Sequence, residues 1–124
     1  MRQVELESLL LWSKHHNQAE HAAYNLLISA LGKEVIYPDA PWIQVDGQPP
    51  EPRVDIDVSK LLGPIRFFPA EKQKIVSVAA SLLDANRPIS LADLTGLNPR
   101  NAELVQTAIA YTMGVMDVTC PQLG

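Results

Sequence analysis

Proline placement divides this chain into segments that must fold differently. Six of the ten prolines, at positions 38, 41, 49, 50, 52 and 64, lie within residues 37–64. Because proline fixes φ and lacks an N–H donor, no long helix runs through this segment. Two extended pieces remain, Trp42–Val45 and Val54–Val58, with a turn signal at Asp46–Gly47. We therefore predict a Pro-rich connector with a small β ribbon, which Trp42 anchors onto the flanking helices.

Residues 3–31 form the longest helical candidate, and they carry two apolar stripes. The main stripe, at about 100° per residue, contains Leu6, Leu10, Tyr24, Leu27, Ile28 and Leu31. A second stripe of smaller side chains contains Ala19, Ala22, Ala23, Leu26 and Ala30. An unbroken helix would be about 44 Å long at about 1.5 Å per residue, so either it breaks near His15–Asn17 or a second copy covers it. Since two apolar faces need cover on two sides, we predict a homodimer.

The last third of the chain has the spacing of three short helices. They are expected at Pro69–Asn86, Ser90–Leu97 and Asn98–Met113, with Asn98 as an N-cap before Pro99. The fold class is therefore mainly α: a long N-terminal helix, the connector and a C-terminal three-helix unit. We divide the single domain, residues 1–124, into segments 1–36, 37–66 and 67–117.

The three-helix unit resembles a helix-turn-helix in its spacing. Ala92 and Gly96 lie four residues apart, as the small residue and the turn glycine of that motif do. Under this interpretation the protein is a DNA-binding regulator, and Arg100, Gln106 and Thr107 read base edges.

The charge distribution disfavours DNA binding. The chain has a net charge of −4; residues 1–65 carry all of it, and residues 66–124 are neutral. Glu103 on the outward face of the last helix would repel phosphates, and Thr95 and Ala102 depart from the usual helix-turn-helix pattern.

Residues 3–31 also contain a cluster of His15, His16, Glu20 and His21, and on a continuous helix His16 and Glu20 share one face. Ser13, Asn17 and Glu20 interrupt the main stripe, with His16 at its edge. Three interpretations follow: a metal site, a hydrogen-bond network that fixes helix register, or a pH-responsive contact. A metal at His16 and Glu20 needs further ligands, from Asp55, Asp57 or a second subunit. We favour the polar network over the metal.

Other features limit the remaining function classes. The single cysteine, Cys120, excludes an intrachain disulfide, and the Leu9–Trp12 run is too short to cross a membrane. We find no signal peptide, no Gly-rich phosphate loop and no nucleophile beside a base, so we identify no catalytic residue and expect no cofactor. Pro49–Arg53 contains a PxxP that would suit a proline-reading domain or a stiff surface loop.

The function that the sequence favours is non-enzymatic. We expect a small cytoplasmic interaction or regulatory module that acts through helical surfaces on an unidentified protein partner, as a homodimer. The first alternative is the helix-turn-helix DNA-binding regulator, and the second is a metal-binding helical protein centred on His16 and Glu20.

Overall fold

The computed structural model describes residues 1–47 and 52–114, and the fold over these ranges is mainly helical. The predicted fold class, helices with a small β ribbon between them, is confirmed. The helices and strands are α1 (Gln3–Trp12), α2 (Gln18–Ala30), β1 (Ile43–Asp46), β2 (Arg53–Ile56), α3 (Val58–Leu62), α4 (Ala70–Leu83) and α5 (Pro99–Thr112). Three short 3₁₀ turns accompany them: η1 (Gly32–Glu34), η2 (Pro64–Phe67) and η3 (Leu91–Leu94).

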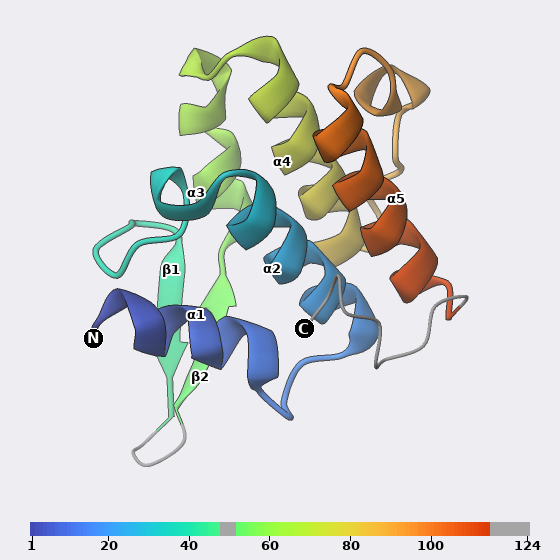
Figure 1. Cartoon of the computed structure of the whole chain (residues 1–124). Helices are drawn as coiled ribbons and strands as arrows, with labels where there is room; N and C mark the ends of the chain where they lie inside the picture. The colour runs from blue at the N-terminus through green and yellow to red at the C-terminus, as the bar shows by residue number, and fades with distance from the viewer. Residues whose placement is uncertain (48–51, 115–124) are drawn as a thin grey trace.

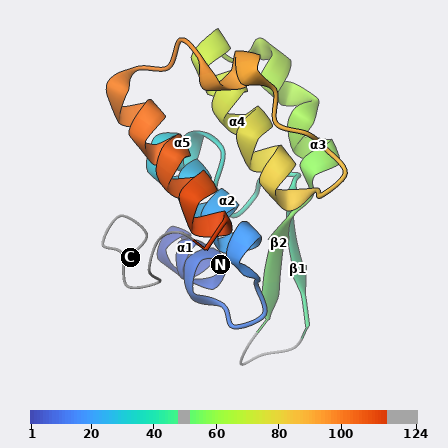
Figure 2. The same cartoon turned by 90° about the vertical axis from the view of Figure 1, so that its right-hand side faces the viewer.

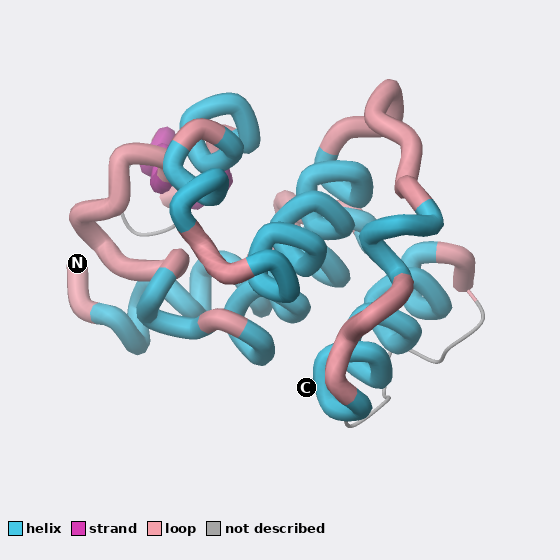
Figure 3. The backbone as a smooth tube through the Cα atoms, turned by 90° about the horizontal axis from the view of Figure 1, so that it is seen from above, coloured by secondary structure: helices cyan, strands magenta, loops and turns pink. Residues whose placement is uncertain are grey.

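Helix α2 lies at the centre of the molecule. α4 and α5 pack along one side of it, while α1 packs against it from the other direction and also contacts β2 (Figures 1 and 2). Seen from above, the two strands occupy one side of an otherwise helical molecule (Figure 3). None of the helices in the described ranges combines the length and the apolar character that a membrane crossing requires.

The two apolar stripes of the N-terminal segment are both buried within one chain. Every residue from Ala22 to Leu27 is buried, as are Leu6 and Leu10 on α1. The prediction that this segment has neighbours on two sides is therefore correct, but α1, α4 and α5 provide the cover. A second copy is not needed to bury these faces, so the two stripes no longer support a homodimer. The homodimer stays a prediction.

The predicted long helix is broken, and the break falls where the sequence allowed one. α1 ends at Trp12 and α2 begins at Gln18, with Ser13–Asn17 as the connecting turn. The break lets α1 fold back against α2, so the apolar residues of both helices face one core.

The connector forms the expected ribbon. β1 and β2 are antiparallel, with Ile43 opposite Ile56 and Asp46 opposite Arg53. Trp42 is buried and its indole Nε1–H donates to the Val35 carbonyl at 2.7 Å, which confirms its anchoring role.

The connector differs from the expectation in one detail, and one segment of it is not described by the structure. The second strand is shorter than predicted, because Asp57 accepts a hydrogen bond from the Lys60 N–H and caps α3, whose first residue is Val58. Most of the PxxP segment, residues 49–51, lies outside the described residues, so its interpretation is untested.

In the C-terminal segment the first and last predicted helices are confirmed, and the short middle one is a 3₁₀ helix. This is η3, which covers Leu91–Leu94 of the predicted residues 90–97. Ser90 is its N-cap: the side chain accepts from the Ala92 N–H, and the Ser90 carbonyl accepts from the Asp93 N–H at 3.0 Å. Gly96 then leaves the helical region at φ +73°. The unit therefore has two full helices, α4 and α5, joined by an irregular corner.

Candidate functional site

The turn between α1 and α2 is built by caps on both helices. The Asn17 side chain accepts from the Glu20 N–H at 2.8 Å, and the Glu20 carboxylate accepts from the Asn17 N–H at 3.1 Å. This reciprocal pair is a capping box, which starts α2 and satisfies two N–H groups that have no partner within the helix. The expectation that His16 and Glu20 share one face of a continuous helix is wrong, because His16 precedes α2 and Glu20 lies in its first turn.

His16 is buried and bridges α1 to the ribbon. Its Nδ1 lies 3.2 Å from the Leu10 carbonyl oxygen, and its Nε2 lies 2.9 Å from the Val54 carbonyl oxygen. Both ring nitrogens thus face acceptors, and the tautomer sets which of the two carbonyls receives the ring N–H. The Asp55 carboxylate lies 3.4 Å from Nε2.

The other two histidines have different positions and contacts. His21 Nδ1 lies 2.9 Å from the Leu11 carbonyl, so His16 and His21 together serve two of the carbonyls that have no partner at the end of α1. His15 is exposed on the turn. The three histidines therefore form no single ligand set.

A second layer of charged and polar groups surrounds His16. Arg53 Nε donates to Asp55 Oδ2 at 2.8 Å, and Arg53 Nη2 donates to Glu20 Oε2 at 3.1 Å. The Tyr24 hydroxyl donates to Asp55 Oδ1 at 3.4 Å. Burial and the nearby Asp55 carboxylate raise the pKa of Tyr24 well above its usual range, and the same carboxylate raises the pKa of the Arg53 guanidinium. The network joins α2 to β2 across more than thirty residues of sequence.

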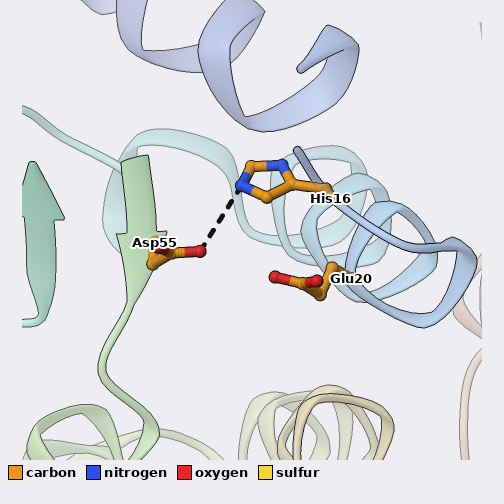
Figure 4. A group of neighbouring side chains, drawn as sticks. All are labelled: His16, Glu20 and Asp55. Carbon is orange, nitrogen blue, oxygen red and sulfur yellow. Dashed lines mark ion pairs between the residues drawn. The ribbon is translucent and has the colours of Figure 1, made fainter. Parts of the chain in front are cut away.

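The structure brings together three residues that the metal hypothesis named. Ligand atoms of His16, Glu20 and Asp55 all lie within 4.8 Å of one another (Figure 4). Asp57, the other proposed ligand, instead caps α3 and accepts from the Gln44 side chain.

The donor atoms of this group are engaged within the protein. Both His16 ring nitrogens face backbone carbonyls. Each carboxylate accepts hydrogen bonds on both oxygens, and the Arg53 guanidinium supplies positive charge to both carboxylates. In the described part of the chain, no buried side-chain nitrogen or oxygen lacks a partner. The arrangement is a hydrogen-bonded network at the turn, and the metal hypothesis stays a prediction.

One of the three residues assigned to base reading is not accessible. Arg100 and Gln106 are exposed, whereas Thr107 is buried at 8% exposure. The Arg100 guanidinium donates to the Ser29 carbonyl at 3.2 Å, near the end of α2. Because α5 packs along α2, the face that contains Thr107 is turned into the protein rather than toward a partner.

A pocket beside the same turn was not anticipated from the sequence. It has a volume of about 210 Å³, and its lining includes Leu9, Trp12, Lys14, His15 and Pro52. Trp12, at the end of α1, is 62% exposed. In the sequence, the only indication of this pocket was the position of Trp12 between the apolar Leu9–Leu11 run and polar Ser13. The direction in which Trp12 faces from α1 depends on where the chain turns.

No protein-family model matches this chain, and neither a curated protein nor a solved structure is significantly similar to it.

Proposed function

We propose that this chain is a small non-enzymatic binding module that docks a segment of a partner protein in the pocket beside Trp12. The observation that carries the proposal is the exposed indole. Aromatic side chains bury about 150–250 Å², so covering the open part of Trp12 at about 25 cal/mol per Å² contributes roughly 3 kcal/mol. Exposed aromatic anchors beside a pocket are typical of residues that dominate protein interfaces.

The chemistry of the pocket defines the partner. Leu9, Trp12 and Pro52 supply apolar lining, while Lys14 and His15 supply polar lining. Among the described residues that line the pocket, none is acidic, although the chain as a whole has a net charge of −4. Charge complementarity therefore favours a segment with an apolar or aromatic side chain next to Asp or Glu.

The α1–α2 turn is suited to hold such a surface. His16 and the capping box fix the backbone on either side of Lys14 and His15. Little conformational entropy of this turn is therefore lost when a partner binds. This is the helical-surface module that the sequence favoured, placed at one end of α1. We retain a cytoplasmic location as part of the proposal, because one cysteine suits a reducing compartment.

We do not favour either alternative over this proposal. DNA binding requires an exposed basic face on α5, yet Thr107 is buried and the exposed Arg100 donates to the Ser29 carbonyl of α2. The structure brings His16, Glu20 and Asp55 together, but metal binding there requires displacement of the Arg53 interactions.

The test is selection of random 12-residue peptides on the immobilised full-length protein, followed by fluorescence anisotropy with the enriched peptides. We expect sequences that pair an aromatic or branched apolar residue with an acid, and at least tenfold weaker binding to Trp12→Ala. Phe67→Ala is the matched control, because Phe67 is another exposed aromatic, 77% accessible and in η2 rather than in the pocket.

Two outcomes would overturn the proposal. One is the absence of enriched peptides, and the other is equal peptide binding by Trp12→Ala and the native chain. Light scattering on the protein eluting from a size-exclusion column tests whether a second copy of the chain occupies the pocket. A native dimer that becomes a monomer in Trp12→Ala would identify the second copy as the partner.

A further inference from the structure

A second pocket lies beneath α4, away from the α1–α2 turn. Its volume is about 380 Å³, within the range of about 300–1,000 Å³ that small-molecule sites have. α4 contributes Gln73, Lys74 and Ser77, the segment after α4 contributes Arg87, and η3 contributes Asp93.

The polar groups of this pocket are held in place by one another and by the backbone. Ser77 Oγ donates to Asp93 Oδ2 at 2.8 Å, and Arg87 Nη2 donates to Ser77 Oγ at 3.3 Å. Gln73 Nε2 donates to the Phe68 carbonyl at 2.7 Å. The donors are therefore positioned without any ligand.

Lys74 is fixed in a similar way. Its ammonium donates to the Thr95 carbonyl at 2.7 Å and passes over Gly96, where an added Cβ would lie 3.0 Å from Lys74 Nζ. The lysine therefore spans from α4 to the corner before α5, and its position depends on that glycine.

The pocket has an excess of positive charge. Lys74 and Arg87 are both half-buried, and within residues 1–47 and 52–114 neither forms an ion pair with a carboxylate. Asp93 is the one acid among the described lining residues, and its Oδ2 already accepts from Ser77.

Both cations also have unused donors. An ammonium has three N–H groups and a guanidinium has five, whereas the hydrogen bonds described for Lys74 and Arg87 use one each, to neutral oxygens. Because Lys74 and Arg87 outnumber Asp93, the one acid among the described lining residues, these partly desolvated cations favour an incoming anion.

We infer that this pocket binds the anionic oxygen group, phosphate or carboxylate, of a small molecule. Arg87 and Lys74 neutralise the charge, Arg87 presenting a planar set of donors and Lys74 a point charge. Ile65, which is buried and also lines the pocket, provides apolar contact for the remainder of the ligand. The inference is independent of the Trp12 pocket.

The experiment is an amide ¹H–¹⁵N titration of the full-length protein with two probes, inorganic phosphate and sodium butyrate, at constant ionic strength. We expect saturable shifts at millimolar probe for the amides of Ser77, Arg87 and Asp93. The arm that saturates at lower concentration identifies the preferred oxyanion. Arg87→Gln and Lys74→Gln are each expected to weaken binding at least tenfold, and their amide dispersion reports whether they remain folded.

The matched control is Lys60→Gln, an exposed lysine on α3 that lies outside the pocket, and it should bind as the native chain does. Shifts that rise linearly with both probes, or equal affinities in Arg87→Gln and Lys60→Gln, would overturn the inference.

Discussion

Replacement of His16 by alanine is the sharpest test of the network at the α1–α2 turn. The substitution removes a buried ring whose nitrogens face the Leu10 and Val54 carbonyls. A buried acceptor left without its donor costs about 1–3 kcal/mol, and the cavity left by the ring adds about 2 kcal/mol, so we predict a destabilisation of roughly 3–5 kcal/mol. That is a large part of the total of about 5–15 kcal/mol for a domain.

Urea unfolding followed by circular dichroism measures this effect. With an m-value near 2 kcal/mol per M, the midpoint of His16→Ala should fall by about 2 M. His15→Ala is the matched control: it removes an adjacent, exposed histidine and should change the free energy of unfolding by less than about 0.5 kcal/mol.

His16→Gln provides a second reading if the alanine variant does not fold. Its amide NH₂ keeps a donor for one of the two carbonyls, so its stability should lie between those of the native chain and His16→Ala. A loss below about 1 kcal/mol for His16→Ala, or losses of equal size in His15→Ala and His16→Ala, would refute the assigned role of the buried ring.

Four further predictions follow from individual contacts. Asn17→Ala removes the N-cap of α2 and should lower the free energy of unfolding by about 1 kcal/mol in the same urea assay. Tyr24 has a raised pKa in the folded state, so its stabilising effect is complete below the ordinary tyrosine pKa of 10.0 and declines as the pH rises above it. The urea midpoints of the native chain and Tyr24→Phe should therefore converge between pH 8 and 11. Parallel curves of midpoint against pH would contradict this. Trp12→Ala should lower the free energy of unfolding by less than about 1 kcal/mol, because the indole is 62% exposed, so a large loss in thermal unfolding would show a structural role instead. A fivefold excess of Zn²⁺ should leave the melting temperature unchanged, whereas a rise of several degrees would favour the metal hypothesis at His16, Glu20 and Asp55.

The oligomeric state can be measured directly, although the two apolar stripes no longer support a homodimer. The apolar faces that suggested a second copy are covered by α1, α4 and α5 of the same chain. A dimer would therefore have to use other exposed apolar residues, such as Trp12, Val45 or Phe67.

Part of the turn is encoded in the sequence. Asn17 followed by Glu20 has the spacing of a capping box, which marks the start of a helix. The prediction of a shared face for Glu20 and His16 on one continuous helix does not use this signal. Periodicity alone did not separate the two cases, because Leu6 and Leu10 on α1 and Tyr24 and Leu27 on α2 fall on one apparent stripe and enter one core.

The helix-turn-helix prediction for the C-terminal segment has a similar weakness. Ala92 and Gly96 have the spacing of that motif, but spacing does not distinguish an α-helix from the 3₁₀ helix η3 that forms here. The burial of Thr107 was likewise decided by the placement of α5 against α2 rather than by the amphipathic pattern of α5.

The sequence by itself determined the helical class, the Pro-rich connector with its ribbon, and the start of α5 at the Asn98 N-cap and Pro99, because these depend on residue pattern and backbone preferences along the chain. Only the tertiary structure decided that Asp55 and Arg53 meet His16 and Glu20, since a turn in the N-terminal segment and a strand more than thirty residues later become neighbours through packing. The two pockets were decided the same way: each combines side chains from segments whose approach is set by burial of the core, which no local pattern records.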